Sequence, residues 1–268
     1  MARGGCNSPT GRWWNGCKQS PLRDAGFSYP SGGGERASGE DKRCRSRCAR
    51  RVFLPPGAPH PYPIGIECAG VVEETSGDAT RYRPGDRAAF VSAMQDKGGS
   101  WAEYAVVDED ALILPLPVDL DFVQAAALPV AGNTALRALA ALGDLDPGSS
   151  IFIAGGAGAI GTLAIQLARL RGLRVAASAS PRNHDYLRSL GAEVAVDYRD
   201  THWPDQIRHW VSKGVDAALA VHPDTSAETL RAVADGGRLI TISGDAVVPE
   251  RGGCPYGACQ AAAGTLGS

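Results

Sequence analysis

The feature that most restricts the fold of this sequence is a run of glycines inside the stretch IFIAGGAGAIGTLAIQLARLRG, residues 151–172. The three large apolar residues that open it predict a buried parallel strand. Gly156, Gly158 and Gly161 then fit the spacing G-x-G-x-x-G, and Gly155 gives an overlapping G-x-x-G-x-x-G. Leucines recur on one helical face after Gly161, so the stretch predicts a strand, a tight turn and a helix, in that order.

This order of elements is typical of a site that binds the diphosphate of a dinucleotide. One glycine allows a sharp turn, a second lets the diphosphate approach the backbone, and a third lets the helix pack on the strand. The first-turn N–H groups, at Ala159 and Ile160, have no intrahelical partner and favour an anion. A glycine-rich turn can also be only a turn, but here the strand and the helix are both predicted.

The residues after the next predicted strand, 174–179, favour NADPH over NADH. A site for NADH usually carries Asp or Glu there, which accepts hydrogen bonds from the ribose hydroxyls. This chain has Ser178 and Ser180, followed by Arg182, and small donors beside a cation suit a 2′-phosphate. Arg182 could also be an ordinary solvated arginine, so the missing acid is the stronger half of the argument.

Charge and hydropathy argue against several other classes of function. The 268 residues carry a formal net charge of −2, which gives no general attraction to nucleic acid. No apolar run reaches the roughly 18–20 residues that cross a membrane, and no secretory signal is recognisable. We therefore expect a cytoplasmic protein in which the seven cysteines are reduced. Cys44 and Cys48 lack further ligands at zinc-site spacing.

Composition divides the chain into four segments. Residues 1–51 hold a single Leu, Ile or Val, which predicts disorder. Residues 52–120 contain short strand-like runs between turns, which predicts a small β domain. Residues 121–250 begin with a helical region, in which Pro129 starts a second helix or kinks the first, and then alternate strands and helices. This alternation predicts an α/β fold with a doubly wound parallel sheet. Residues 251–268 form an unpatterned tail.

Seven stretches match one known family in order and spacing. They are GIECAGVVEE (65–74), RPGDR (83–87), GSWAEYAVV (99–107), AAALPVAGNTAL (125–136), GGAGAIG (155–161), LGAEVAVDY (190–198) and DGGRLITI (235–242). Together they resemble the medium-chain dehydrogenase/reductase superfamily, in its zinc-independent, zeta-crystallin-like quinone oxidoreductase branch. The resemblance implies a partial GroES-like domain over 52–120, a Rossmann domain over 121–250, and a nicotinamide in the cleft between them. It also implies a homodimer.

The resemblance predicts chemistry without zinc. Zinc-dependent members carry His-Glu where this chain has Ile66 and Glu67, and the cysteines of their structural zinc loop are missing from 95–101. Glu67 is then expected to be structural. The expected reaction is hydride transfer from NADPH to a small-molecule quinone or to the β-carbon of an α,β-unsaturated carbonyl.

The resemblance also implies where site residues lie. Asn133 and Thr134 are the catalytic candidates beside the nicotinamide, although Thr134 could equally cap a helix start. Tyr198 matches a tyrosine beside the adenosine phosphate, and Ile242 and Ser243 match backbone that lines the nicotinamide pocket. With these three, the expected cofactor-binding set is Gly155, Gly156, Gly158, Ala159, Ile160, Gly161, Ser178, Ser180, Arg182, Tyr198, Ile242 and Ser243.

Tyr104 and His222 could each lie either at the expected site or away from it. Tyr104 is expected in the protein core rather than beside the substrate. His222 is the one histidine of five that ends a predicted strand at the expected mouth of the site, so it is the one to test.

Both ends of the chain depart from the family pattern. The first strands of the catalytic domain, and the return to that domain after the Rossmann part, are replaced by 1–51 and 251–268. We hypothesise that both ends are translated out of frame, which the encoding DNA would test. Three functions stay open: an NADPH-dependent quinone or enone reductase, an NADPH-binding protein with impaired or no catalysis, and an enoyl reductase that acts on a carrier-bound thioester.

Overall fold

The computed structural model describes residues 13–19, 65–76, 81–91, 100 and 104–242. The chain divides into two compact units, Met1–Val130 and Ala131–Ser268. The boundary lies inside helix α3 (Pro129–Ala141), where the sequence had suggested 120/121. Pro129 begins this helix and does not kink α2 (Phe122–Ala125). Among the described helices, none is both long and apolar enough to cross a membrane.

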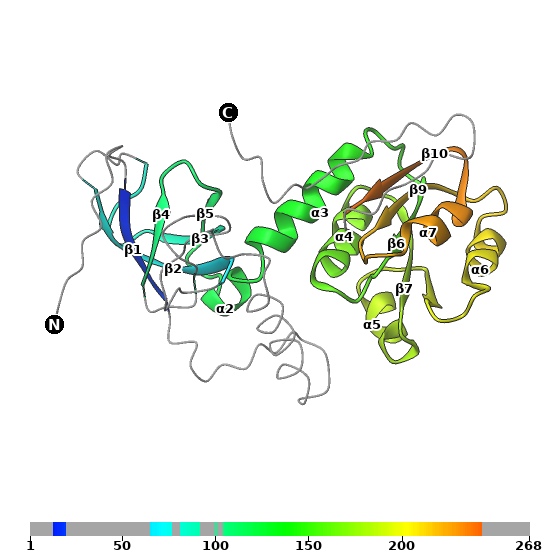
Figure 1. Cartoon of the computed structure of the whole chain (residues 1–268), viewed down its shortest axis with the longest axis horizontal. Helices are drawn as coiled ribbons and strands as arrows, with labels where there is room; N and C mark the ends of the chain where they lie inside the picture. Colours follow the sequence, from blue (N-terminus) through cyan, green and yellow to red (C-terminus); the bar gives the residue numbers. More distant parts are fainter. Residues whose placement is uncertain (1–12, 20–64, 77–80, 92–99, 101–103, 243–268) are drawn as a thin grey trace. The chain divides into compact units, whose positions relative to one another are not determined.

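The first unit contains an antiparallel sheet in the order β4-β1-β2-β3-β5 (Figure 1). Its strands are β1 (Trp13–Gln19), β2 (Glu67–Thr75), β3 (Arg87–Val91), β4 (Tyr104–Asp108) and β5 (Ile113–Pro115). The expectation of disorder over 1–51 is wrong for β1, which lies between β4 and β2. Backbone pairing with two neighbouring strands holds this segment, and such pairing leaves little trace in local sequence.

Strand β3 is buried on both faces of the first sheet. Because side chains alternate along a strand, Phe90 packs in one cluster with Cys68, whereas Ala89 packs in another. The second cluster includes Ala125 of α2, so that helix covers one face of the sheet. The small residues of β2 and β3 allow this close approach.

The second unit contains a parallel sheet in the order β10-β9-β6-β7-β8 (Figure 1). The chain runs outward from β6 through β7 to β8 and then returns to the other side of β6. This confirms the doubly wound sheet and puts the reversal of strand order between β6 and β9. The elements are β6 (Ser150–Ala154), α4 (Ala159–Leu170), β7 (Arg174–Ala179), η2 (Pro181–Asn183), α5 (His184–Ser189), β8 (Val194–Asp197), α6 (Trp203–Trp210), β9 (Val215–Ala220), α7 (Ser226–Ala232) and β10 (Val233–Thr241).

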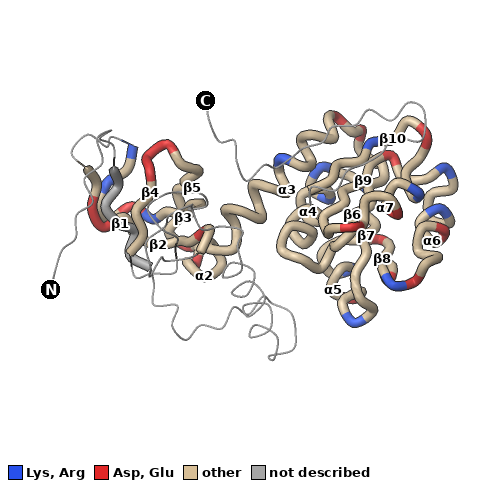
Figure 2. Tube along the Cα trace, in the orientation of Figure 1, with Lys and Arg blue, Asp and Glu red and all other residues tan. Residues whose placement is uncertain are grey.

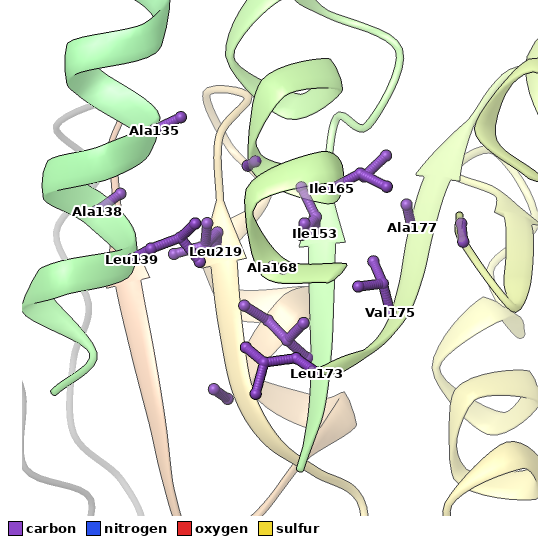
Figure 3. Packing of buried hydrophobic residues seen from close by; sticks show 14 of the residues in the cluster. Ala135, Ala138, Leu139, Ile153, Ile165, Ala168, Leu173, Val175, Ala177 and Leu219 are labelled. Atoms are coloured by element: carbon purple, nitrogen blue, oxygen red, sulfur yellow. The ribbon is translucent and has the colours of Figure 1, made fainter. Parts of the chain in front are cut away.

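Alternate residues of this sheet pack against two layers of helices. Ile153 of β6 and Leu219 of β9 lie in one cluster with residues of α3 and α4 (Figure 3). Phe152 faces the other way, and its ring stacks on that of Trp203 in α6, with centroids 4.6 Å apart. Basic and acidic residues are interspersed along the described chain, in keeping with the small net charge (Figure 2).

Candidate dinucleotide-binding site

The glycine turn between β6 and α4 is tied to the end of β7. Gly155 has a φ of +92°, and its N–H donates to the Ser178 hydroxyl oxygen at 3.1 Å. The N–H of Gly156 donates to the Ser178 carbonyl oxygen at 2.9 Å. The backbone of the turn is therefore fixed at the carboxyl edge of the sheet before any ligand binds.

Two of the three motif glycines are required by packing. A Cβ at Gly161 would lie 2.3 Å from the Gly155 carbonyl oxygen and 2.7 Å from the Gly156 Cα. A Cβ at Gly156 would lie 2.8 Å from the Ala177 Cβ. Gly158 differs, since it is exposed and the nearest atom to its Cβ position is the Gly155 carbonyl oxygen at 3.5 Å. Packing does not demand a glycine at 158, so that position is open to a ligand.

The start of α4 can receive an anion. Gly158 is the N-cap residue and, as a glycine, provides no side-chain cap for this helix start. The first-turn N–H groups at Ala159 and Ile160 belong to half-exposed residues. Such groups have no intrahelical acceptor, and the helix dipole adds partial positive charge. The turn and helix start thus fit a diphosphate, and the three predicted glycine positions come together as expected.

The other side of the turn is formed by the end of β9. Ideal-Cβ distances from Gly155 are 3.5 Å to the His222 Cβ and 3.6 Å to the Val221 Cβ. The N–H of Val221 donates to the Ala154 carbonyl oxygen at 3.1 Å, which fixes this segment beside β6. Ile242, at the end of β10, is half-buried and donates its N–H to the Ala220 carbonyl oxygen at 3.0 Å.

The residues predicted to bind the adenosine end have different surroundings. Ser178 is 3% exposed, and its hydroxyl is occupied by the Gly155 N–H, so it acts on the turn. Ser180 is half-buried and its hydroxyl accepts a hydrogen bond from Asn183 at 3.3 Å. Arg182 and Tyr198 are exposed, on η2 and after β8. Ser243 lies outside the described residues.

Arg199 is a basic residue at the end of β8 that sequence reasoning missed. Its guanidinium carbon lies 5.6 Å from the centre of the Tyr198 ring, and its Nε donates to Asp197 at 3.1 Å. Burial alone would raise the pKa of Asp197, but hydrogen bonds from the Arg199 N–H and guanidinium lower it. The sequence signal was the arginine directly after the tyrosine of the motif LGAEVAVDY.

The catalytic candidates lie inside α3. Asn133 and Thr134 are half-buried, and Thr134 lies in the second turn, so it cannot cap the start of the helix. A Cβ at Gly132 would lie 3.9 Å from the Leu163 side chain of α4. The amino-terminal part of α3 therefore runs beside the first turns of α4, near the glycine turn.

Glu67 in the first unit has a structural contact at the start of α3. Its carboxylate accepts a hydrogen bond from the Val130 N–H at 2.7 Å. Burial raises the pKa of Glu67, and the bond from Val130 opposes this rise. Tyr104 is 49% exposed, so the expectation that it packs in the core is wrong. Its position on β4 turns the ring outward.

Both units are similar to known protein families. Residues 39–118 match the family described as alcohol dehydrogenase GroES-like domain, and residues 159–251 match the family described as zinc-binding dehydrogenase. A trans-enoyl reductase from Aspergillus terreus, tazE, is 32% identical over 226 residues, which cover 75% of this chain and 73% of that protein. The chain belongs to the medium-chain dehydrogenase/reductase superfamily. Members of this superfamily bind a nicotinamide cofactor, which agrees with the glycine turn.

Other members of the superfamily are similar over a shorter share of their length. Human quinone oxidoreductase is 31% identical over 185 residues, 68% of this chain and 55% of that protein. The solved structure of a quinone oxidoreductase from Coxiella burnetii is 32% identical with a TM-score of 0.60, and the match covers 68% of this chain and 56% of that one. The chain thus spans about half the length of these two relatives.

The described residues do not form a metal site. Nowhere among them do three His, Cys, Asp or Glu side chains lie close enough together to hold a metal ion. Cys68, next to Glu67, is buried and not in a disulfide. The types and arrangement of the residues in this part of the chain therefore do not supply the three protein ligands that a catalytic zinc needs.

Proposed function

We propose that this chain is an NADPH-dependent reductase that transfers hydride to a quinone or an α,β-unsaturated carbonyl without zinc. The observation that carries the proposal is the glycine turn, where Gly161 is required by backbone contact and Gly158 faces outward without a side chain. Quinone oxidoreductases among the relatives support the reaction class.

The preference for NADPH rests on the carboxyl ends of β7 and β8. Residues 178–183 contain no carboxylate, and Arg182 is exposed. The acid at the end of β8 is Asp197, and Arg199 donates a hydrogen bond to it. Because Ser178 is occupied by the turn, we assign the 2′-phosphate to Ser180, Arg182 and the neighbourhood of Tyr198.

The protein's own groups hold and orient the reactants. The N–H groups of Ala159 and Ile160 bind the diphosphate, and the backbone at Ile242 lines the nicotinamide side. Asn133 and Thr134 orient the nicotinamide ring from α3. When bound, the nicotinamide supplies a hydride. The protein accelerates the reaction by aligning the reactants at near-attack distance. This alignment requires a fixed turn such as the one that Ser178 holds.

Zinc has no part in the proposed reaction because the residue types do not suit it. Ile66 stands where zinc-dependent relatives have histidine, and among the described residues Cys68 belongs to no group of three His, Cys, Asp or Glu side chains that could hold a metal ion. The match to the family described as zinc-binding dehydrogenase is therefore not an argument that this chain binds zinc.

Two alternatives remain beside this proposal. An enoyl reductase that acts on a carrier-bound thioester is favoured by the similarity to the trans-enoyl reductase tazE, of which the chain covers 73%. An NADPH-binding protein with impaired or no catalysis is the other. For location and assembly we propose a cytoplasmic homodimer, which cell fractionation and light scattering would test.

The deciding experiment combines turnover with binding. NADPH oxidation is followed with a panel of quinones, enones and carrier-bound enoyl thioesters, beside calorimetric titration of NADPH and NADH. Oxidation with quinones or enones supports the proposal, and oxidation with thioesters alone supports the enoyl reductase. Binding without oxidation supports the non-catalytic protein. If neither dinucleotide binds, the proposal fails.

The cofactor preference is tested with Arg182→Ala. We expect weaker binding of NADPH by about tenfold and unchanged binding of NADH, since only NADPH carries the phosphate that pairs with the guanidinium. Arg188→Ala is the matched control, because this exposed arginine is paired with Asp185 on α5. Equal loss for both dinucleotides, or tighter binding of NADH by the unmodified protein, would contradict the preference.

A further inference from the structure

His222 occupies the β9 side of the glycine turn. It directly follows Val221, whose N–H is bonded to the end of β6, and its Cβ is 3.5 Å from the ideal Cβ position of Gly155. This is the point where the strand order reverses, and ligands of doubly wound sheets bind outside the carboxyl ends of the strands there. Its side chain is exposed.

A tight turn fixes the backbone and the ring of His222. The Thr225 hydroxyl donates to the His222 carbonyl oxygen at 2.6 Å, and Asp224 has a φ of +62°. Nδ1 lies 2.9 Å from the Pro223 carbonyl oxygen. Because a carbonyl oxygen only accepts, Nδ1 carries the hydrogen, and Nε2 is the nitrogen left to meet a ligand.

We propose that His222 binds the diphosphate of the dinucleotide through Nε2, from the side of the turn opposite to β7. The inference rests on the proposed dinucleotide binding and adds a side chain to a site otherwise built of backbone N–H groups. Protonated imidazole donates from Nε2 to an anionic phosphate oxygen, whereas the neutral ring in this tautomer cannot.

Few charges compete with this interaction. Residues 155–159 of the glycine turn and residues 240–242 at the end of β10 contain no titratable side chain. On the turn of His222 itself, Asp224 is the one acid and it is exposed. Within these described segments of the turn and of β10, no charged side chain competes with an anionic ligand for the ring, and a bound diphosphate would favour the protonated form.

The test uses ADP-ribose, which has the diphosphate but neither a nicotinamide nor a titrating 2′-phosphate. Calorimetry of the full chain at pH 6 and pH 8 gives affinities, and buffers of different ionisation enthalpy give the protons taken up. We expect binding about fivefold to tenfold tighter at pH 6 than at pH 8, with proton uptake on binding, since only the protonated ring donates from Nε2 to the phosphate. In His222→Gln both effects should vanish while binding persists.

His184→Gln is the matched control, because this histidine also lies at the carboxyl edge, with Nε2 3.2 Å from the Ala179 carbonyl oxygen. The His184→Gln variant should bind ADP-ribose with the same pH dependence as the parent. Unchanged proton uptake in His222→Gln, or its loss in His184→Gln instead, would overturn the role of His222. Failure of all variants and the parent to bind ADP-ribose and NADPH would instead overturn the proposed function.

Discussion

Replacing Gly161 with alanine tests the physical basis of the cofactor site. The added Cβ would lie 2.3 Å from the Gly155 carbonyl oxygen, 2.7 Å from the Gly156 Cα and 2.9 Å from the Gly156 carbonyl carbon. All three atoms are backbone, so no side chain can rotate away. An ordinary contact needs about 3.5 Å, so α4 must move from the turn by about 1 Å.

Such overpacking in a rigid core costs about 3 kcal/mol. For a unit of this size, we expect the melting temperature to fall by roughly 6–12 °C. The same shift moves the first-turn N–H groups of α4 away from the diphosphate. We therefore expect Gly161→Ala to weaken NADPH binding by at least about tenfold, because a displacement of 1 Å misaligns hydrogen bonds.

Gly158→Ala separates stability from binding. The added Cβ would be 3.5 Å from the nearest atom, and residue 158 has an ordinary φ of −82°. The free energy of unfolding should therefore change by less than about 1 kcal/mol. The methyl group would nevertheless stand where the ligand approaches, so NADPH binding should weaken. Thermal unfolding and calorimetric titration of both variants give the comparison.

A Gly161→Ala protein with the melting temperature of the parent would show that the backbone contact does not exist. A Gly158→Ala protein that binds NADPH as the parent does would contradict the assignment of the binding site. In that case the exposed face of the turn is not the diphosphate site, whatever the stability of the fold.

The remaining predictions concern two half-buried carboxylates near the starts of strands, Glu67 of β2 and Asp216 of β9. Burial raises the pKa of Glu67 above its ordinary 4.5, so the folded state holds more protons than the unfolded one, and stability falls as pH rises through that window. Thermal unfolding of Glu67→Gln at several pH values should no longer show this fall, and a fall that persists would contradict the prediction. Glu67→Ala loses the hydrogen bond from Val130, so its free energy of unfolding should drop by about 1 kcal/mol. For Asp216, burial raises the pKa, but hydrogen bonds from Ser150 and Lys213 outweigh it and hold the pKa below 3.8, so stability is lost as pH falls from about 3.8. Asp216→Ala should destabilise the second unit by about 2 kcal/mol with unchanged NADPH affinity, since Asp216 lies at the amino end of β9; a large loss of affinity in folded protein would argue against this.

The sequence by itself determined the features that depend on neighbouring residues. The glycine spacing predicted the turn from β6 into α4. Pro129 predicted either a helix start or a kink, and in the structure it starts α3. Alternation of apolar strands and amphipathic helices predicted the parallel sheet, because burial on both faces forces that pattern. Boundaries differed by some residues, as in the division between the two units, which lies after Val130 where the sequence suggested 120/121.

Only the tertiary structure decided the contacts between distant segments. Strand β1 pairs with β2 and β4 although its own residues give no strand pattern. Ser178 looked like a phosphate ligand from its place after a strand, but its hydroxyl holds Gly155. The place of His222 beside that turn depends on the return of the chain from β8 to β9. Such pairings join residues far apart in sequence, so local propensity cannot encode them.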